Sequence, residues 1–148
     1  DDALNATKAA IEEGIVAGGG AALIYAREAI TRDNVGAQLV YKACGRPFEQ
    51  ILTNAGYDLS SAKILSLEVA KSIITGPWHG YNLKTEIVEN LRDAGIIDPT
   101  KVTRTAIESA ASVAGTILLT ECVVVDDPDS KDEADPMAGM MNGMNGMM

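Results

Sequence analysis

The chain has 148 residues, of which 47% are hydrophobic and 22% charged, so it is long enough for one folded domain, and wholesale disorder, a collagen-like repeat and a disulfide-stapled scaffold are excluded. Aromatic residues make up only 4%, so the core must consist of small aliphatic side chains, and we expect a mainly α fold. The 21 acidic and 12 basic residues give a net charge of −9, without a basic stripe that could neutralise nucleic-acid phosphates.

The cysteines and the apolar runs narrow the class of protein further. Cys44 and Cys122 lie far apart and His79 is the only histidine, so the sequence predicts neither a zinc site nor a disulfide framework, and a reducing compartment fits best. The longest uncharged stretch before the C-terminal region, residues 14–26, has 13 residues, fewer than the roughly 18 that a membrane span needs. We therefore expect no nucleic-acid partner and no membrane partner.

Apolar residues recur every three or four positions along most of the chain, which predicts a series of helices. Gly18–Gly20 separate the first two, and Gly45 with Pro47 predicts a break between the third and the fourth. Residues 78–83 alternate briefly and predict a short strand or turn. The predicted helices cover residues 2–17, 20–30, 35–43, 48–55, 60–75, 85–95 and 98–117.

The C-terminal region has a different composition. Residues 119–125 include a β-branched run and predict a short edge strand. Residues 126–148 contain six acids followed by repeats of methionine, glycine and asparagine, which predict a flexible tail. The tail is either an adaptable surface that touches partners or an end without function, and periodicity does not choose between these two readings.

The glycine run Gly18–Gly20 is the first candidate site. Glycine allows a ligand to approach the backbone closely, and the start of the following helix offers free N–H groups to an anion. The alternative reading is that the glycines only let two helices turn and pack, and the spacing alone favours this second reading.

Two acidic residues are the other candidates. Asp98 could bond to a ribose hydroxyl, but its place before Pro99 is also that of an ordinary helix N-cap. Asp2 could act as a general base or position a water molecule, but an acid in a first turn also complements the helix dipole. For both residues the structural reading is favoured by position alone, and His79 receives no role.

Several segments of the chain form a distinctive set: DALNATKAAIEEGIVAGGG at 2–20, NVG at 34–36, GYN at 80–82, GIIDPTKVTR at 95–104, AASVAG at 110–115 and TECV at 120–123. Taken together, these segments resemble one protein family, the group I chaperonins (the Hsp60-type large subunit of the bacterial chaperonin). The resemblance covers the whole chain, is weakest at residues 57–78, and corresponds to a carboxy-terminal fragment of the subunit.

The resemblance implies the fold of a chaperonin equatorial domain, with residues 1–125 as the carboxy-terminal half of this ATP-binding domain. It also implies an ATP-dependent machine of two stacked seven-membered rings of identical subunits, which folds client proteins with a co-chaperonin. A bacterial cytoplasm is expected, with the mitochondrial matrix as the alternative compartment.

The family's functional residues carry over by motif. Asp2 matches the catalytic aspartate that helps to activate water, and Gly19 matches a nucleotide contact. Asn82, Leu83 and Lys84 match three positions beside the adenine, and Asp98 matches the carboxylate near the ribose. ATP is the implied cofactor, together with Mg²⁺ whose ligand lies outside these residues.

The departures from the family pattern limit what the chain can do by itself. Leu83 and Lys84 replace smaller residues beside the adenine. The phosphate loop and the Mg²⁺-binding aspartate of the family are not among these 148 residues, so we expect the chain alone not to hydrolyse ATP. The alternative function is a non-enzymatic helical module, derived from the same scaffold, that assembles or binds a partner.

Overall fold

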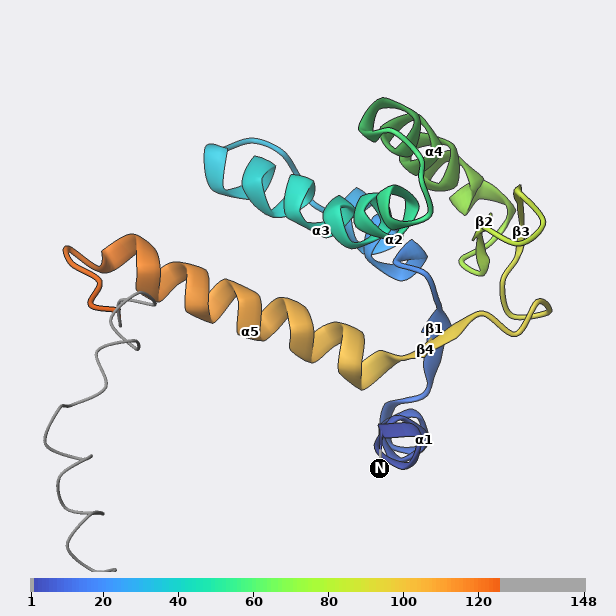
Figure 1. Ribbon diagram of the computed structural model, residues 1–148, viewed down its shortest axis with the longest axis horizontal. Helices are drawn as coiled ribbons and strands as arrows, with labels where there is room; N and C mark the ends of the chain where they lie inside the picture. The colour runs from blue at the N-terminus through green and yellow to red at the C-terminus, as the bar shows by residue number, and fades with distance from the viewer. Residues whose placement is uncertain (1, 126–148) are drawn as a thin grey trace, which may run out of the picture. The chain divides into compact units, whose positions relative to one another are not determined.

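The computed structural model describes residues 2–125, and the chain forms two compact units, residues 1–113 and 114–148. The structure is mainly helical, as the composition predicts (Figure 1). Among the described residues, no helix has the length and apolar character needed to cross a bilayer. The elements are α1 (Asp2–Glu13), β1 (Ile15–Ala17), α2 (Ala21–Glu28), α3 (Val35–Asn54), α4 (Leu59–Lys71), a 3₁₀ turn η1 (Ser72–Thr75), β2 (His79–Asn82), β3 (Ile87–Asn90), β4 (Ile97–Pro99) and α5 (Thr100–Leu119).

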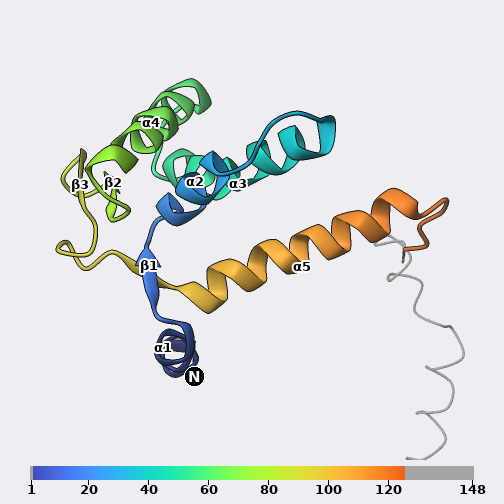
Figure 2. The same ribbon diagram turned by 180° about the vertical axis from the view of Figure 1, so that it is seen from behind.

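The core of the first unit lies among α2, α3 and α4, which pack on one another (Figures 1 and 2). In α3 the buried side chains Cys44, Phe48 and Leu52 repeat every four residues, so one face of the helix is turned inward. Small side chains such as Ala21 and Ala62, both almost fully buried, allow the helices to approach closely. The core cluster consists of Ala17, Ala21, Ile24, Phe48, Leu52, Ala62, Val69 and Leu91.

One continuous helix, α3, replaces the two helices that were predicted at 35–43 and 48–55, so the predicted break at Gly45 and Pro47 is wrong. A proline inside a helix costs about 3 kcal/mol because it removes one N–H donor and crowds the preceding turn. Here Cys44 precedes Pro47 and Phe48 follows it, and both are buried on the core side. Core burial on either side of the proline therefore outweighs its local cost.

The predicted first helix, 2–17, is too long, because α1 ends at Glu13. The N–H of Gly14 donates to the carbonyl of Ala10 at 2.8 Å, and Gly14 has a φ of 81°, a left-handed conformation that ends helices and suits glycine. The next residues leave the helix and form β1.

The predicted helix at 85–95 is also wrong, whereas the strand predicted within 78–83 is confirmed as β2. β2 and β3 form an antiparallel hairpin in which His79 faces Asn90 and Asn82 faces Ile87. Ile87 and Leu91 are four residues apart, a spacing that is also typical of a helix, but cross-strand pairing with the preceding segment, residues 79–82, determines the outcome. The helix predicted at 60–75 is confirmed as α4 followed by η1.

In the second unit, the prediction of a strand at residues 119–125 is wrong for the residues that the structure describes. α5 continues to Leu119, and residues 120–125 take part in no strand of the described chain. A strand is stable only when a second backbone pairs with it, and the exposed side chains of Val123, Val124 and Val125 have no such neighbour in residues 2–125. The predicted tail, 126–148, lies outside the described residues.

Candidate functional site

The candidate site is organised by an antiparallel pair of short strands, β1 and β4, which connects segments about 80 positions apart in the sequence (Figure 1). Val16 faces Asp98, and Ala17 faces Ile97. Beyond the pair, the N–H of Gly18 donates to the carbonyl of Ile96 at 3.0 Å. The pairing therefore brings the glycine run and the Asp98 segment together.

The three glycines have different roles. A side chain on Gly18 would approach the backbone of Ile96 and Ile97 to 3.0 Å, and one on Gly20 would approach the backbone N of Phe48 to 2.9 Å. At Gly19 a Cβ would meet nothing within 4 Å, and the residue needs glycine because its φ is 64°. Packing therefore accounts for Gly18, and Gly20 is required both by packing and by its own left-handed φ of 81°. Gly19 has a left-handed backbone with open space around it.

Asp98 does not cap the following helix, and the N-cap interpretation of this residue is wrong. Asp98 lies within β4, and α5 begins at Thr100. The Asp98 carboxylate accepts a hydrogen bond from the N–H of Gly19. Two of the residues chosen from the sequence, Gly19 and Asp98, are therefore in direct contact across the strand pair.

Asp98 is half-buried, and this burial raises the pKa of its carboxyl above the ordinary value of 3.8, an effect that the hydrogen bond from Gly19 partly opposes. The structure supplies no cation to this carboxylate among the ion pairs of residues 2–125. A half-buried carboxylate without a cationic partner can accept further hydrogen bonds from hydroxyl groups of a ligand.

The β2–β3 hairpin carries the three residues predicted beside the adenine. Asn82 is buried at the end of β2, where its amide donates to Glu89 and its side-chain oxygen accepts from the N–H of Lys84 at 2.9 Å. Leu83 packs against the core cluster, and Lys84 is exposed. These bonds fix the turn that joins β2 to β3.

The hairpin is tied to the start of α2, the helix that follows the glycine run. A Cβ on Gly80 would lie 3.0 Å from the Cβ of Ala21 and 2.4 Å from Leu91, so glycine is required for this close approach. The hydroxyl of Tyr25 in α2 donates to the carbonyl of His79. Within the described residues, no hydrogen bond or ion pair joins Asn82, Leu83 or Lys84 to Gly19 or Asp98.

Sequence reasoning missed Glu89, which accepts from both Asn82 and Thr85 and holds the hairpin turn together. A helix over residues 85–95 would also place Thr85 and Glu89 one turn apart, so local spacing does not distinguish the two structures. The pairing of β2 with β3 and the bond from Asn82 to Glu89 do distinguish them.

Asp2 lies apart from the other candidates. It is the exposed first residue of α1, whose other end at Glu13 adjoins β1. At about 1.5 Å per residue, the helix places its two ends roughly 17 Å apart. The structure therefore does not bring Asp2 to Gly19 and Asp98.

α1 is held to the first turns of α5 by charged side chains. Lys101 pairs with Glu12, and the guanidinium of Arg104 binds both carboxylate oxygens of Glu13, with Nε–Oε2 at 3.0 Å and Nη2–Oε1 at 2.6 Å. The hydrogen bonds from Arg104 lower the pKa of the Glu13 carboxyl. The N–H of Thr100 also donates to the carbonyl of Gly14 at 3.1 Å, so the strand pair is fixed at its outer end.

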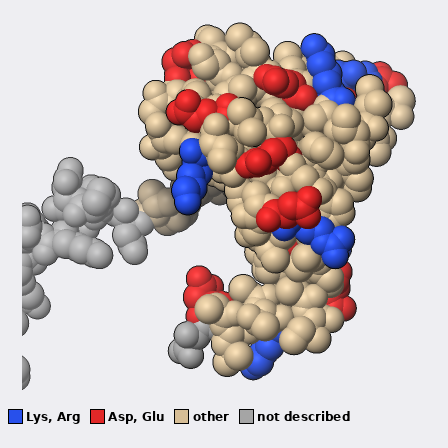
Figure 3. Space-filling model, turned by 90° about the vertical axis from the view of Figure 1, so that its right-hand side faces the viewer, with Lys and Arg blue, Asp and Glu red and all other residues tan. Residues whose placement is uncertain are grey.

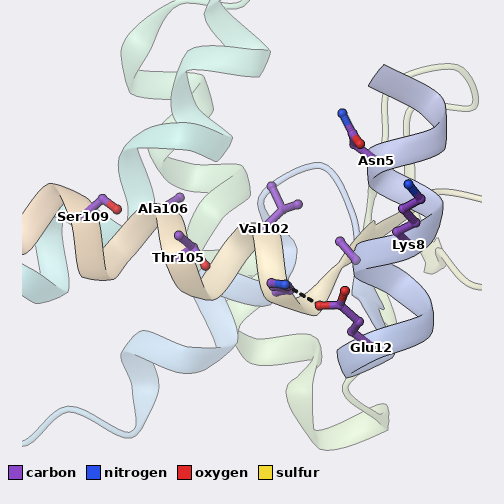
Figure 4. Close-up of a pocket in the computed structure, with 9 residues that line it drawn as sticks. Asn5, Lys8, Glu12, Val102, Thr105, Ala106 and Ser109 are labelled. Atoms are coloured by element: carbon purple, nitrogen blue, oxygen red, sulfur yellow. Dashed lines mark hydrogen bonds and ion pairs between the residues drawn. The ribbon is translucent and has the colours of Figure 1, made fainter. Parts of the chain in front are cut away.

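A groove of about 510 Å³ lies between α1 and the beginning of α5 (Figure 4). Its charged groups are largely satisfied, because Glu12 is paired with Lys101 on the opposite wall. None of the residues predicted to bind nucleotide lines it.

Within residues 2–125 no three His, Cys, Asp or Glu side chains are placed to hold a metal ion. On the face shown in Figure 3, acidic and basic side chains are interspersed.

Replacement of single glycines should separate packing from conformation. We expect Gly19→Ala to lower the free energy of unfolding by about 1–2 kcal/mol, the cost of a left-handed non-glycine residue. Gly20→Ala should cost about 2–5 kcal/mol, because overlap with the backbone of Phe48 adds to that strain. Urea unfolding followed by circular dichroism measures both values. Equal losses in the two variants would contradict the distinction.

Asp98 should reduce the stability of the ligand-free chain at neutral pH. A raised pKa in the folded state means that the folded chain binds the proton more tightly than the unfolded chain, so stability falls as pH rises through the raised pKa. We expect Asp98→Asn to be at least as stable as the wild type at pH 7, with the difference shrinking toward pH 3.8. Urea unfolding at several pH values tests this, with exposed Asp93→Asn as control. A less stable Asp98→Asn at pH 7 would show that the charge stabilises the fold.

Two comparisons with known proteins place this geometry in a family. A crystal structure of a group III chaperonin in the open state matches 78% of this chain with a TM-score of 0.68 and 21% sequence identity, which shows the chaperonin fold that was expected for the equatorial domain. The match covers 25% of that chaperonin chain, so the present chain spans about a quarter of its length. Residues 1–128 match the sequence profile of the TCP-1/cpn60 chaperonin family. The chain therefore belongs to the TCP-1/cpn60 chaperonin family.

Proposed function

We propose that this chain supplies half of the nucleotide pocket in the equatorial domain of an ATP-dependent chaperonin subunit of group I. The observation that carries the proposal is the contact between Gly19 and Asp98, formed across β1 and β4. It joins an open, left-handed glycine to a half-buried carboxylate, and the residues of both segments also resemble the family's nucleotide-binding motifs.

Each residue has a defined task in this proposal. Gly19 allows the nucleotide to approach the backbone, since no atom occupies the space where its side chain would be. Asp98 accepts hydrogen bonds from the ribose hydroxyls. Asn82, Leu83 and Lys84 lie beside the adenine, with Leu83 as the apolar contact and the turn held by Asn82.

The reaction itself needs groups from elsewhere in the subunit. ATP supplies the phosphoryl group that is transferred to water, and its transition state requires charge neutralisation by Mg²⁺ and phosphate-binding groups. In this proposal the Mg²⁺ ligand belongs to another part of the subunit. Asp2 activates the attacking water in the assembled subunit, where a different segment brings the phosphates toward the start of α1.

The exposed apolar residues at the end of α5 and beyond it support assembly into rings. Leu118, Leu119 and Val124 are 82%, 88% and 92% exposed, an arrangement that is unfavourable in water and typical of surfaces that become buried in a complex. In the proposed assembly, residues 120–125, which follow α5, pair with strands of a neighbouring identical subunit. The rings contain seven subunits each, act in the cytoplasm with a co-chaperonin, and fold unfolded client proteins.

The second candidate function is a non-enzymatic helical module that assembles or binds a partner. The exposed apolar residues at the end of α5 could provide the binding surface of such a module. A module of this kind does not, however, explain why Gly19, with open space around it, contacts the half-buried carboxylate of Asp98. The nucleotide-binding function is therefore the better supported of the two.

The contact between Asp98 and the ribose can be tested by removing each partner in turn. In the full-length subunit that contains this chain, we expect Asp98→Asn to weaken ATP binding about 10- to 100-fold, the range for a hydrogen bond to a charged group. The same variant should bind 2′,3′-dideoxy-ATP within twofold of the wild type, because this nucleotide has no ribose hydroxyls. Calorimetric titration measures both affinities. Equal weakening for the two nucleotides would remove Asp98 from ribose recognition, and Asp93→Asn provides the matched control.

Asp2 should affect turnover rather than binding. We expect Asp2→Ala in the full-length subunit to leave the ATP affinity within twofold of the wild type and to lower kcat about 100- to 10,000-fold, the usual range for loss of a general base. Steady-state phosphate release measures kcat, and Asn5→Ala, one turn further along α1, is the control. Unchanged hydrolysis would exclude Asp2 from the mechanism.

A further inference from the structure

A second cavity lies away from the candidate nucleotide site, at the junction of α2, α3 and α4. It has a volume of about 540 Å³, within the range of small-molecule sites. Its walls share no residue with the glycine run, the β2–β3 hairpin or β4. The lining residues are Arg27, Tyr41, Lys42, Arg46, Glu49, Lys63, Ser66 and Leu67.

The cavity gathers positive charge in an acidic protein. Four of the chain's 12 basic residues line it, whereas the net charge of the chain is −9. Glu49 pairs with Arg46 at 2.9 Å, and Glu28 pairs with Arg27 at 3.3 Å. Lys42 and Lys63 form no ion pair within residues 2–125, so two positive charges remain uncompensated.

Arg27 is the central feature of this cavity, because its guanidinium is buried and only partly hydrogen-bonded. The residue is 5% exposed. Its Nη2 donates to Ser66 Oγ at 3.0 Å and its Nε donates to Glu28, but Nη1 has no acceptor among the described residues. A guanidinium carries five N–H donors. No buried side-chain nitrogen or oxygen of the described residues lacks a hydrogen-bond partner, so the Nη1 donors that no protein group accepts are open to solvent in the cavity, where a ligand can reach them.

The surroundings of Arg27 hold these donors in place. A Cβ on Gly45 would lie 2.4 Å from Nη1, so the helix α3 leaves the volume of a side chain free for the guanidinium. The ring of Tyr41 lies 4.8 Å from the guanidinium carbon of Arg27 and 4.4 Å from that of Arg32, and its hydroxyl donates to Glu28 at 2.8 Å. The guanidinium is thereby fixed by three helices of the core.

We propose that this cavity binds a small anion bearing several phosphate groups. A rigid guanidinium with free donors and two unpaired ammonium groups is the combination that proteins use for phosphate oxygens. Three helices of the core provide the walls. A compact polyphosphate can reach Arg27 in the cavity, whereas an acidic surface of another protein would reach only the exposed Lys42 and Lys63 at the rim.

Binding of inorganic tripolyphosphate to the full-length subunit tests the proposal. The titration is carried out by calorimetry with ADP present in excess, so that a nucleotide pocket elsewhere in the subunit is occupied. We expect Lys42→Gln/Lys63→Gln to weaken tripolyphosphate binding at least tenfold. The matched control Lys8→Gln/Lys71→Gln removes the same charge from other surfaces and should change the affinity less than twofold.

Four further outcomes are decisive. Arg27→Gln should abolish binding, and because this variant could unfold the core, Gly45→Ala, which displaces Nη1, must also weaken binding in a subunit whose circular dichroism is native. Equal weakening in the two lysine pairs would show non-specific attraction and overturn the proposal, as would the absence of tripolyphosphate binding to the wild type. Since ADP binding is measured separately, failure of this proposal and failure of the nucleotide-binding proposal give different results.

Discussion

The antiparallel pairing of β1 with β4 is the interaction on which the candidate site depends. It is only three residues long on each side, and a two-stranded ladder of this length is marginal in water. Its neighbours supply the missing stability: Gly18 is fitted against Ile96, Thr100 is bonded to Gly14, and the fork of Arg104 on Glu13 holds α1 to α5. The Gly19–Asp98 contact exists because these surrounding interactions keep the two short strands aligned.

The glycine run shows why the two interpretations of its sequence could not be separated beforehand. Packing against Ile96 and Phe48 requires glycine at 18 and 20, as the packing interpretation predicts, whereas Gly19 is required only by its backbone conformation, and its contact with a ligand stays a prediction. Consecutive glycines look alike in a sequence, and the difference between them arises from chain segments 30 to 80 positions away. For the same reason the local sequence around Asp98 predicts a helix cap, whereas its partner, the N–H of Gly19, lies across the strand pair.

The elements that could be predicted from the sequence are those whose stability is local. α4 and its 3₁₀ extension follow from an Asp58 cap and a helical period, and most of α5 follows from its apolar spacing. The errors occur where packing or strand pairing outweighs the local signal. α3 continues through Pro47 because core residues lie on both sides of it, and residues 87–90 form a strand because the neighbouring β2 pairs with them. Motif resemblance selected Gly19 and Asp98 together, whereas no rule of local spacing could have placed them in contact.

Asp98 and Arg27 have a common physical property, although their charges are opposite. Each is an ionisable side chain with hydrogen-bonding capacity that the described residues do not use: Asp98 receives one backbone hydrogen bond and no cation, and Nη1 of Arg27 has no protein acceptor but remains open to solvent. A complementary ligand can supply the hydrogen bonds that the fold leaves out, and it then gains affinity from them. The sign of each charge agrees with the ligand group proposed for it: hydroxyl donors at Asp98, and phosphate oxygens at Arg27.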